Sequence, residues 1–164
     1  RQRQMCIRDR LCACILNRPR HKEIINMLNK MKVKINFITD GDIAGALSVI
    51  GEKPINDIYL GTGGGPEGVI TAAALSCYGA QIQGRLVLND EEKVRAKKLG
   101  VKGFAKKYNI DDMVKGDVIF CATGITNGDL VKGIVVTNDQ FEVHTLALHK
   151  SQNIKTKIFN IYRK

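Results

Sequence analysis

The amino-acid sequence predicts an α/β fold, and two observations support that prediction. From Leu11 onward, short apolar runs of strand character alternate with segments of helical character, an order typical of parallel βαβ units. In the last third, three strand-like runs follow one another with only polar turns between them, which indicates an antiparallel meander. We therefore predict a layered α/β fold with a mostly parallel sheet, flanking helices and a C-terminal antiparallel meander.

The predicted elements follow from apolar runs, periodicity and turn residues. Three strand–helix pairs come first, with strands at 11–16, 34–39 and 57–61 and helices at about 19–31, 41–50 and 66–78. Next come a strand at 82–88, a charged helix at 90–100, a short segment at 111–114 and a strand at 117–123. The predicted meander consists of 133–137, 141–149 and 154–162.

Residues 1–10 do not fit this pattern. The stretch RQRQMCIRDR has neither strand nor helix periodicity and runs abruptly into the apolar strand that begins at Leu11. We interpret 1–10 as a foreign or disordered leader and 11–164 as one domain. A chain of 164 residues with 44% apolar residues suits a single sizeable core.

The composition of the chain indicates which kind of partner it binds and in which cellular compartment it works. The 26 Lys and Arg outnumber the 16 Asp and Glu, so anionic partners such as phosphate esters are favoured. The basic residues are scattered without aromatic neighbours, which argues against specific nucleic-acid binding. No apolar run is long enough to span a membrane. The chain has five cysteines, an odd number, and no two of them form a CxxC pair. We therefore expect buried free thiols in a reducing cytoplasm.

The turn after the first predicted strand is basic. Arg18 and Arg20 flank Pro19, whose fixed backbone suits the first position of the following helix. Because ligands of open α/β sheets bind at the carboxyl ends of the strands, two guanidinium groups here are candidates for gripping a phosphate. A solvated basic turn is the plain alternative.

The turn after the second predicted strand is acidic. Asp40 is expected to cap the following helix, Gly41 to adopt a backbone conformation closed to other residues, and Asp42 to lie in the first helical turn. Capping explains one carboxylate but not two. Both carboxylates are therefore candidates for accepting hydrogen bonds from sugar hydroxyls.

The turn after the third predicted strand is rich in glycine. Gly63, Gly64 and Gly65 precede Pro66, which is expected to open a helix. Three consecutive glycines indicate that something approaches the backbone closely, as in an anion or hydroxyl cradle. Glu67 follows in the first helical turn, where a carboxylate is readily ionised and suits Mg²⁺ or Mn²⁺. It is the best candidate metal ligand.

A dinucleotide site is the rival interpretation of the same turn. Gly63, Gly65 and Gly68 satisfy G-x-G-x-x-G between a strand and a helix, and Asp90 ends a later strand at a suitable distance. The Glu67 carboxylate counts against it, because it would lie beside the pyrophosphate and repel it. An NAD(P)-binding module remains the alternative function.

The order of NRPRH, TDGDIA, GTGGGPEGVITAAAL, IQGRLV and CATGITNGDL resembles the C-terminal half of the class II fructose-1,6-bisphosphatases, which belong to the inositol-monophosphatase-like sugar phosphatases. The resemblance runs from about Leu11 to Lys164 and implies hydrolysis of fructose 1,6-bisphosphate to fructose 6-phosphate and phosphate in gluconeogenesis. It implies Mn²⁺ or Mg²⁺ as cofactor and a homo-oligomer when the protein is full length. The family's N-terminal half, with its other metal-binding carboxylates, has no counterpart here, so we interpret the chain as a fragment.

Carried over position by position, the resemblance assigns roles to single residues. It implies substrate binding by Arg18, Pro19, Arg20, Asp40, Gly41, Asp42 and Gly64, and metal binding by Glu67. Arg18 stands where Lys is common in the family, and Gly65 where Ala is common. The catalytic residues are expected mostly in the absent half.

Overall fold

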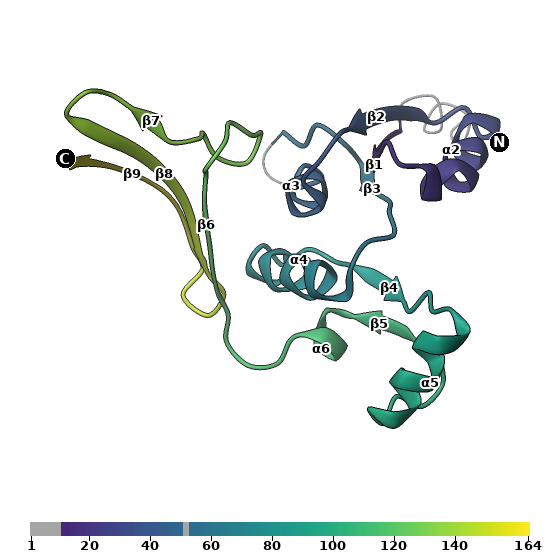
Figure 1. Ribbon diagram of the computed structural model, residues 1–164. Coiled ribbons are helices and arrows are strands. Elements are labelled where there is room, and N and C mark those ends of the chain that lie inside the picture. Colours follow the sequence, from purple (N-terminus) through teal and green to yellow (C-terminus); the bar gives the residue numbers. More distant parts are fainter. Residues whose placement is uncertain (1–10, 51–52) are drawn as a thin grey trace.

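The computed structural model describes residues 11–50 and 53–164, which form three small β-sheets with helices beside and between them (Figure 1). The predicted leader at 1–10 lies outside the described residues. Within the described part of the chain, no helix is long and apolar enough to cross a membrane.

Sheet A confirms the predicted parallel βαβαβ start. Its order is β2-β1-β3, with β1 (Cys12–Leu16) in the centre and β2 (Lys34–Ile38) and β3 (Ile58–Tyr59) parallel to it on either side. The crossovers are a 3-10 turn, η1 (Pro19–His21), that continues into α2 (Lys22–Lys30), and then α3 (Asp42–Leu47). Because β1 has a neighbour on both sides, residues 13–16 are buried and form the centre of this sheet.

Helix α4 (Gly65–Cys77) joins sheet A to the rest of the molecule. Its apolar C-terminal part packs against the antiparallel sheet of the C-terminal strands (sheet C). Leu75 and Cys77 of the helix belong to one buried cluster with Phe120, Leu146 and Leu148 of that sheet. Its N-terminal end follows the turn after β3. One helix therefore links the main core to the carboxyl edge of sheet A.

The prediction of a mostly parallel sheet is correct only for sheet A. The next strands, β4 (Gln83–Arg85) and β5 (Lys107–Asn109), form a separate antiparallel pair, and α6 (Ile110–Met113) follows β5. The helix between them, α5 (Asp90–Lys98), buries none of its residues. A parallel crossover needs a helix with an apolar face to cover the sheet, and the sequence of α5 has no such face.

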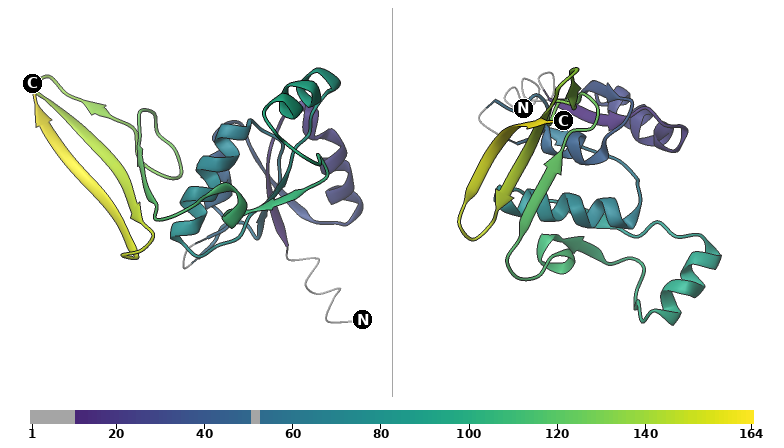
Figure 2. Two further views of the ribbon diagram at one scale, coloured as in Figure 1. Left: turned by 90° about the horizontal axis from the view of Figure 1, so that it is seen from below. Right: turned by 60° about the vertical axis from the view of Figure 1, so that its left-hand side comes forward.

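The predicted C-terminal meander is confirmed, and one further strand joins it. Strands β7 (Val135–Val136), β8 (Gln140–His149) and β9 (Ile154–Arg163) follow one another in antiparallel pairs, and β6 (Ile119–Thr123) also pairs antiparallel with β8. The long β8–β9 hairpin projects away from sheet A (Figure 2). Together these strands form sheet C.

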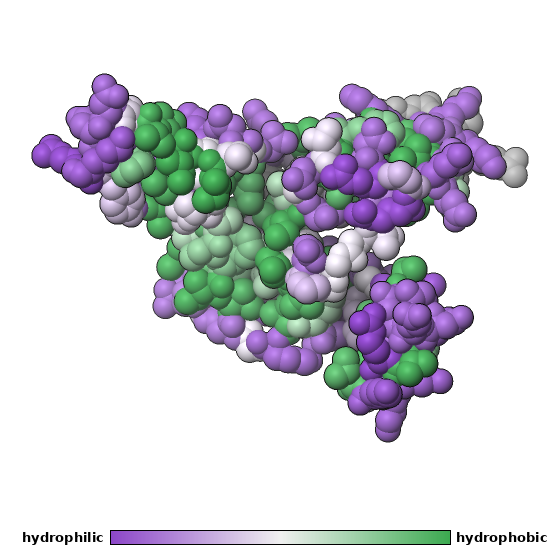
Figure 3. Space-filling model, in the orientation of Figure 1, coloured by the Kyte–Doolittle hydropathy of each residue, from purple (hydrophilic) through white to green (hydrophobic). Residues whose placement is uncertain are grey.

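The two faces of sheet C differ sharply. Alternate residues of a strand point to opposite faces, so the face that carries Leu146 and Leu148 packs on α4. The other face holds exposed apolar side chains such as Ile119 and Ile158, and its part of β6 includes Cys121. Cys121 is exposed, which corrects the expectation of buried thiols for this residue. Apolar surface is visible over this part of the molecule, whereas the α5 region is mostly polar (Figure 3).

Asp117 connects the start of β6 to the turn between β8 and β9. Its Oδ2 accepts a hydrogen bond from the Ser151 hydroxyl at 2.6 Å and pairs with His149 Nε2 at 2.7 Å. Its Oδ1 accepts from the backbone amides of Val118 and Ser151. The Asp117 carboxylate and the Ser151 hydroxyl both lie at the same ring nitrogen of His149, Nε2, whereas a relay needs them at opposite nitrogens of the ring. The three residues therefore do not form an acid–base–nucleophile relay.

These hydrogen bonds, first that of Ser151 and then that of His149, hold the pKa of Asp117 well below its usual value. A lowered pKa in the folded state adds stability above the unfolded pKa of about 3.9, and that stability is lost as pH falls through the folded pKa. We expect Asp117→Asn to destabilise the chain at pH 6 and to differ less from wild type at pH 3. Urea unfolding at both pH values measures this, and an equal difference at the two would contradict the prediction.

Candidate functional site

The candidate site lies where the three parallel strands of sheet A end. The basic turn follows β1, the acidic turn follows β2 and the glycine-rich turn follows β3. Because parallel strands place their carboxyl ends at one edge, these turns meet in space although they are far apart in sequence. The hydrogen bonds between them show how closely they meet.

The basic turn confirms the predicted helix start. Pro19 occupies the first helical position, and Arg18 precedes it in an extended conformation. The Arg20 Nε donates a hydrogen bond to the Thr62 carbonyl oxygen at 2.5 Å, which ties this arginine to the glycine-rich turn. Both arginines are exposed, and no other side-chain hydrogen bond of theirs is found within 11–50 and 53–164. The other N–H groups of the two guanidinium groups are available to an anion.

His21 fixes the distance between the basic and glycine-rich turns. It is fully buried, and its Nδ1 lies 2.8 Å from the Leu16 carbonyl oxygen. Its Nε2 lies 2.9 Å from the Thr62 amide nitrogen. One neutral tautomer satisfies both contacts, with Nδ1–H donating to Leu16 and Nε2 accepting from Thr62. His21 is therefore a structural link from the end of β1 to the turn after β3.

The acidic turn differs from prediction in one respect. Gly41 adopts a left-handed conformation with φ of 86° and is itself the N-cap of α3, as its predicted freedom allows. Asp40 therefore does not cap the helix, and its Oδ1 instead accepts a hydrogen bond from the adjacent Gly41 amide. The expected capping role is wrong because the left-handed residue stands between Asp40 and the helix. Asp42 is the first residue of α3 and therefore lies in the first helical turn, as predicted.

The Asp42 side chain connects the acidic turn to β3 and to the glycine-rich turn. Its Oδ1 accepts a hydrogen bond from the Tyr59 hydroxyl on β3. Its Oδ2 lies 3.6 Å from the position that a Cβ of Gly63 would occupy. The carboxylate thus lies between Tyr59 and the glycine-rich turn, whereas Asp40 contacts neither.

In the glycine-rich turn, a missing side chain serves close approach at Gly64, and unusual backbone angles are not the reason for the glycines. None of Gly63, Gly64 and Gly65 has a positive φ. A Cβ on Gly64 would come within 2.1 Å of the Glu67 carboxylate, which folds back over that glycine. A Cβ on Gly65 would meet nothing within 4 Å, so alanine at this position fits without rearrangement.

Glu67 lies in the first turn of α4, as predicted, and is exposed. It offers one carboxylate to a hard cation. Among the residues that the structure describes, no three His, Cys, Asp or Glu side chains gather as a metal site. A complete Mn²⁺ or Mg²⁺ site does not fit these residues alone, and Glu67 is a single ligand at most.

The dinucleotide interpretation fits poorly with the same geometry. The Glu67 carboxylate occupies the space over Gly64 that a pyrophosphate would need. Asp90 begins α5, next to the antiparallel pair β4–β5, and is not at the end of a strand of sheet A. Both features that would hold the nucleotide are therefore misplaced.

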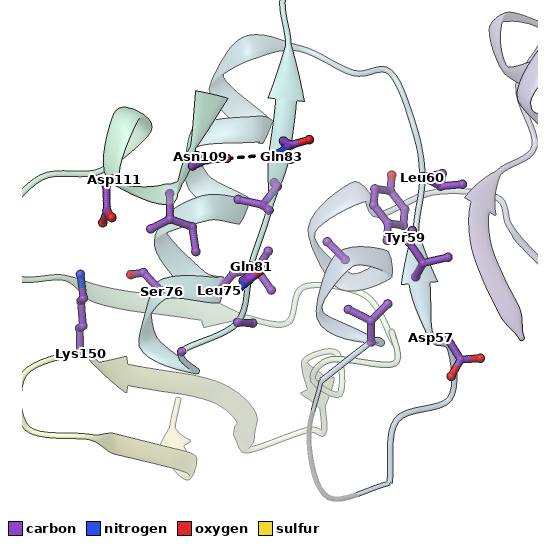
Figure 4. A pocket seen from close by; sticks show the side chains of 17 residues that line it. Asp57, Tyr59, Leu60, Leu75, Ser76, Gln81, Gln83, Asn109, Asp111 and Lys150 are labelled. Atoms are coloured by element: carbon purple, nitrogen blue, oxygen red, sulfur yellow. Dashed lines mark hydrogen bonds between the residues drawn. The ribbon is translucent and has the colours of Figure 1, made fainter. Parts of the chain in front are cut away.

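A groove lies beside the candidate turns and not in them. It has a volume of about 990 Å³ and is lined from sheet A by Asp57, Tyr59 and Leu60, from α4 by Leu75 and Ser76, and from the far side by Asn109, Asp111 and Lys150 (Figure 4). None of the eight predicted site residues lines it. Tyr59 alone belongs to both places, with its ring in the groove and its hydroxyl on Asp42.

Tyr59, His21 and Thr62 are the residues of this edge that the sequence did not single out. Tyr59 fell within the predicted strand at 57–61, and His21 within the predicted helix at about 19–31. One signal in the sequence could have found Tyr59. Its polar hydroxyl stands in the short apolar run just before the glycine-rich turn. Nothing local in the sequence indicated the contacts of His21, since Thr62 lies 41 residues away.

Fold and site together define an α/β protein with a candidate anion and polyol site at the carboxyl edge of a parallel sheet. A family model described as bacterial fructose-1,6-bisphosphatase, glpX-encoded, matches residues 3–162. The chain belongs to this family.

Two curated relatives illustrate the similarity. The chain is 31% identical over 168 residues to a D-fructose 1,6-bisphosphatase class 2/sedoheptulose 1,7-bisphosphatase of Synechococcus sp. (strain JA-3-3Ab), covering 94% of this chain and 48% of the relative. It is 33% identical over 167 residues to a fructose-1,6-bisphosphatase class 2 of Haemophilus influenzae, covering 93% of this chain and 50% of the relative. The chain spans about half the length of these relatives.

Proposed function

We propose that the whole protein hydrolyses fructose 1,6-bisphosphate to fructose 6-phosphate and phosphate, and that this chain supplies the substrate-binding half. The observation that carries the proposal is the meeting of a basic, an acidic and a glycine-rich turn at one edge of sheet A, in a chain of this family. A sugar bisphosphate needs cations for its phosphates and acceptors for its hydroxyls. This edge offers both.

The proposed roles follow from the chemistry of each turn. The guanidinium groups of Arg18 and Arg20, with Pro19 fixing the backbone between them, bind a substrate phosphate. Asp42, Asp40 and the Gly41 turn accept or position sugar hydroxyls, and Gly64 lets the sugar approach the backbone. Glu67 supplies one carboxylate toward Mn²⁺ or Mg²⁺, whose remaining ligands lie outside the described residues. We further propose a cytoplasmic enzyme that forms a homo-oligomer at full length.

The proposal is tested by phosphate release from fructose 1,6-bisphosphate with Mn²⁺. The 164-residue chain is compared with the same chain joined to the N-terminal half of the Haemophilus influenzae relative, referred to below as the joined enzyme. Activity of the joined enzyme alone supports the proposal. A joined enzyme that folds but releases no phosphate from this or sedoheptulose 1,7-bisphosphate would contradict it.

Replacing Arg20 with alanine is expected to raise the KM of the joined enzyme for fructose 1,6-bisphosphate by roughly 10- to 100-fold, because a charged hydrogen bond to phosphate contributes about 1.5–3 kcal/mol. The value of kcat should change much less, since a phosphate grip acts in the ground state as well as in the transition state. Steady-state kinetics measure both. Arg95→Ala on the remote helix α5 is the matched control, and an equal effect there would contradict the assignment.

A further inference from the structure

We propose that Tyr59 is a positioning residue of the substrate site, which holds the Asp42 carboxylate in the orientation that receives the sugar. The inference rests on the proposed function, because it assigns a purpose to the contact of a residue that the proposal places at the substrate. Tyr59 itself touches Asp42 and need not touch the sugar.

The first observation is how the Asp42 carboxylate is held. Its Oδ1 accepts the hydrogen bond of the Tyr59 hydroxyl, and its two oxygens lie 3.6 Å (Oδ2) and 3.8 Å (Oδ1) from the position that a Cβ of Gly63 would occupy. A carboxylate with one oxygen held cannot rotate freely about its terminal torsion, so the second oxygen keeps one direction. The carboxylate held in this way lies beside the glycine-rich turn, where the proposed sugar approaches the backbone.

The second observation is that two glycines make room for the Tyr59 ring. A Cβ on Gly45 of α3 would come within 2.8 Å of the ring carbon Cε2. A Cβ on Gly61 would come within 3.1 Å of the hydroxyl oxygen. The ring is therefore held between the first helix turn after the acidic loop and the strand end of β3, with its hydroxyl aimed at Asp42.

The state of the phenol supports its role as a donor. Tyr59 is half-buried, and burial, followed by the hydrogen bond to Asp42, raises its pKa above the ordinary value. The hydroxyl therefore keeps its proton across the physiological range and donates a hydrogen bond to the carboxylate. Asp42 in turn remains an acceptor on its free oxygen.

A purely structural role would predict a different pattern of kinetic effects. If Tyr59 only filled space, Tyr59→Phe would preserve the packing of the ring and leave substrate affinity unchanged. If it acts through Asp42, the loss of the hydroxyl frees the carboxylate and weakens substrate binding while the ring stays in place. The two roles are separated by whether the effect of Tyr59→Phe depends on Asp42.

The test is a double-mutant cycle in the joined enzyme, with KM and kcat measured for Tyr59→Phe, Asp42→Ala and the double variant. We expect Tyr59→Phe to raise KM roughly 3- to 10-fold with kcat nearly unchanged, as loss of a hydrogen bond to a charged group implies. In the Asp42→Ala background the same substitution should have no further effect. Tyr108→Phe on β5, which lies away from the candidate turns, is the control and should leave KM unchanged.

Each outcome bears on a separate claim. A Tyr59→Phe variant with unchanged KM, or with the same KM increase in the presence and absence of the Asp42 carboxylate, overturns the positioning role and leaves the proposed function intact. An Asp42→Ala variant with unchanged KM shows instead that the proposed substrate role of Asp42 is wrong, and the inference falls with it. If the effects of Tyr59→Phe and Asp42→Ala on KM are non-additive, both the substrate role of Asp42 and the positioning role of Tyr59 are supported.

Discussion

Replacing His21 with leucine is expected to lower the free energy of unfolding by about 1–3 kcal/mol, because a hydrogen-bonding group left without a partner in the interior costs about that much. Leucine fills a similar volume but leaves the Thr62 amide without the ring nitrogen that accepts its hydrogen bond, whereas the Leu16 carbonyl keeps the bond that the Arg18 amide donates to it. Thr62 is half-buried, so the free-energy cost of leaving its amide without a partner lies at the lower end of that range. Urea unfolding followed by circular dichroism measures the change.

The matched control is His144→Leu. His144 is half-buried on β8, and its described contact is with the Phe159 ring, at 4.9 Å between centroids. Leucine preserves most of that apolar contact, so the same substitution here should cost much less than at His21. If the two variants unfold at the same urea concentration, the hydrogen bonds of His21 do not carry the stability that their geometry indicates.

The effect of His21→Leu should extend to substrate binding in the joined enzyme. The Thr62 carbonyl that receives Arg20 belongs to the same residue whose amide binds the His21 ring. Releasing that residue loosens the position of Arg20 relative to the glycine-rich turn. A rise in KM together with the loss of stability is therefore expected from this one buried contact.

The parallel part of the fold was predictable because its signals are local. Each strand of sheet A is a short apolar run, each crossover begins at a proline or glycine with fixed backbone preferences, and the turns fall at the predicted ends. The same reasoning placed Pro19 at the first helical position and Asp42 in the first helical turn. Alternation of strands and helices in a sequence therefore specified the arrangement up to α4.

The pairing of the later strands was not predictable from alternation alone. The segment at 82–109 also reads strand, helix, strand, yet β4 and β5 pair antiparallel. The difference lies in the helix between them, because α5 opens with a complete capping box and carries charge on every side, so it forms a stable helix without a face to bury. The polarity of a connecting helix is thus a better guide to strand direction than its presence.

The candidate site was predictable by position but not by contact. Sequence reasoning found residues at three strand ends, whereas the bonds that join them come from Tyr59, His21 and Thr62. These contacts span 17 to 42 residues of sequence and have no local signature. Of the three consecutive glycines, only Gly64 is a place of close approach, and the neighbour that approaches it is Glu67 of the chain itself.

Replacing Glu67 with glutamine in the joined enzyme is expected to raise the Mn²⁺ concentration needed for half-maximal activity by at least about 10- to 100-fold. Substitutions one shell beyond a metal already cost roughly that much affinity, and glutamine removes an anionic oxygen from the position that a hard cation prefers. The Glu67 carboxylate is exposed and lies against Gly64 in the first turn of α4. It is therefore open to a cation held by ligands from elsewhere in the protein.

The control for this variant is Glu91→Gln, which removes a carboxylate from the first turn of the remote helix α5. Direct Mn²⁺ binding, followed by the electron paramagnetic resonance signal of the free ion, measures affinity independently of turnover. Weaker binding by the Glu67 variant, with normal binding by the Glu91 variant, identifies Glu67 as a ligand. Normal binding together with lost activity would place Glu67 at the substrate instead, because its carboxylate lies over the same glycine to which the sugar-binding role is assigned.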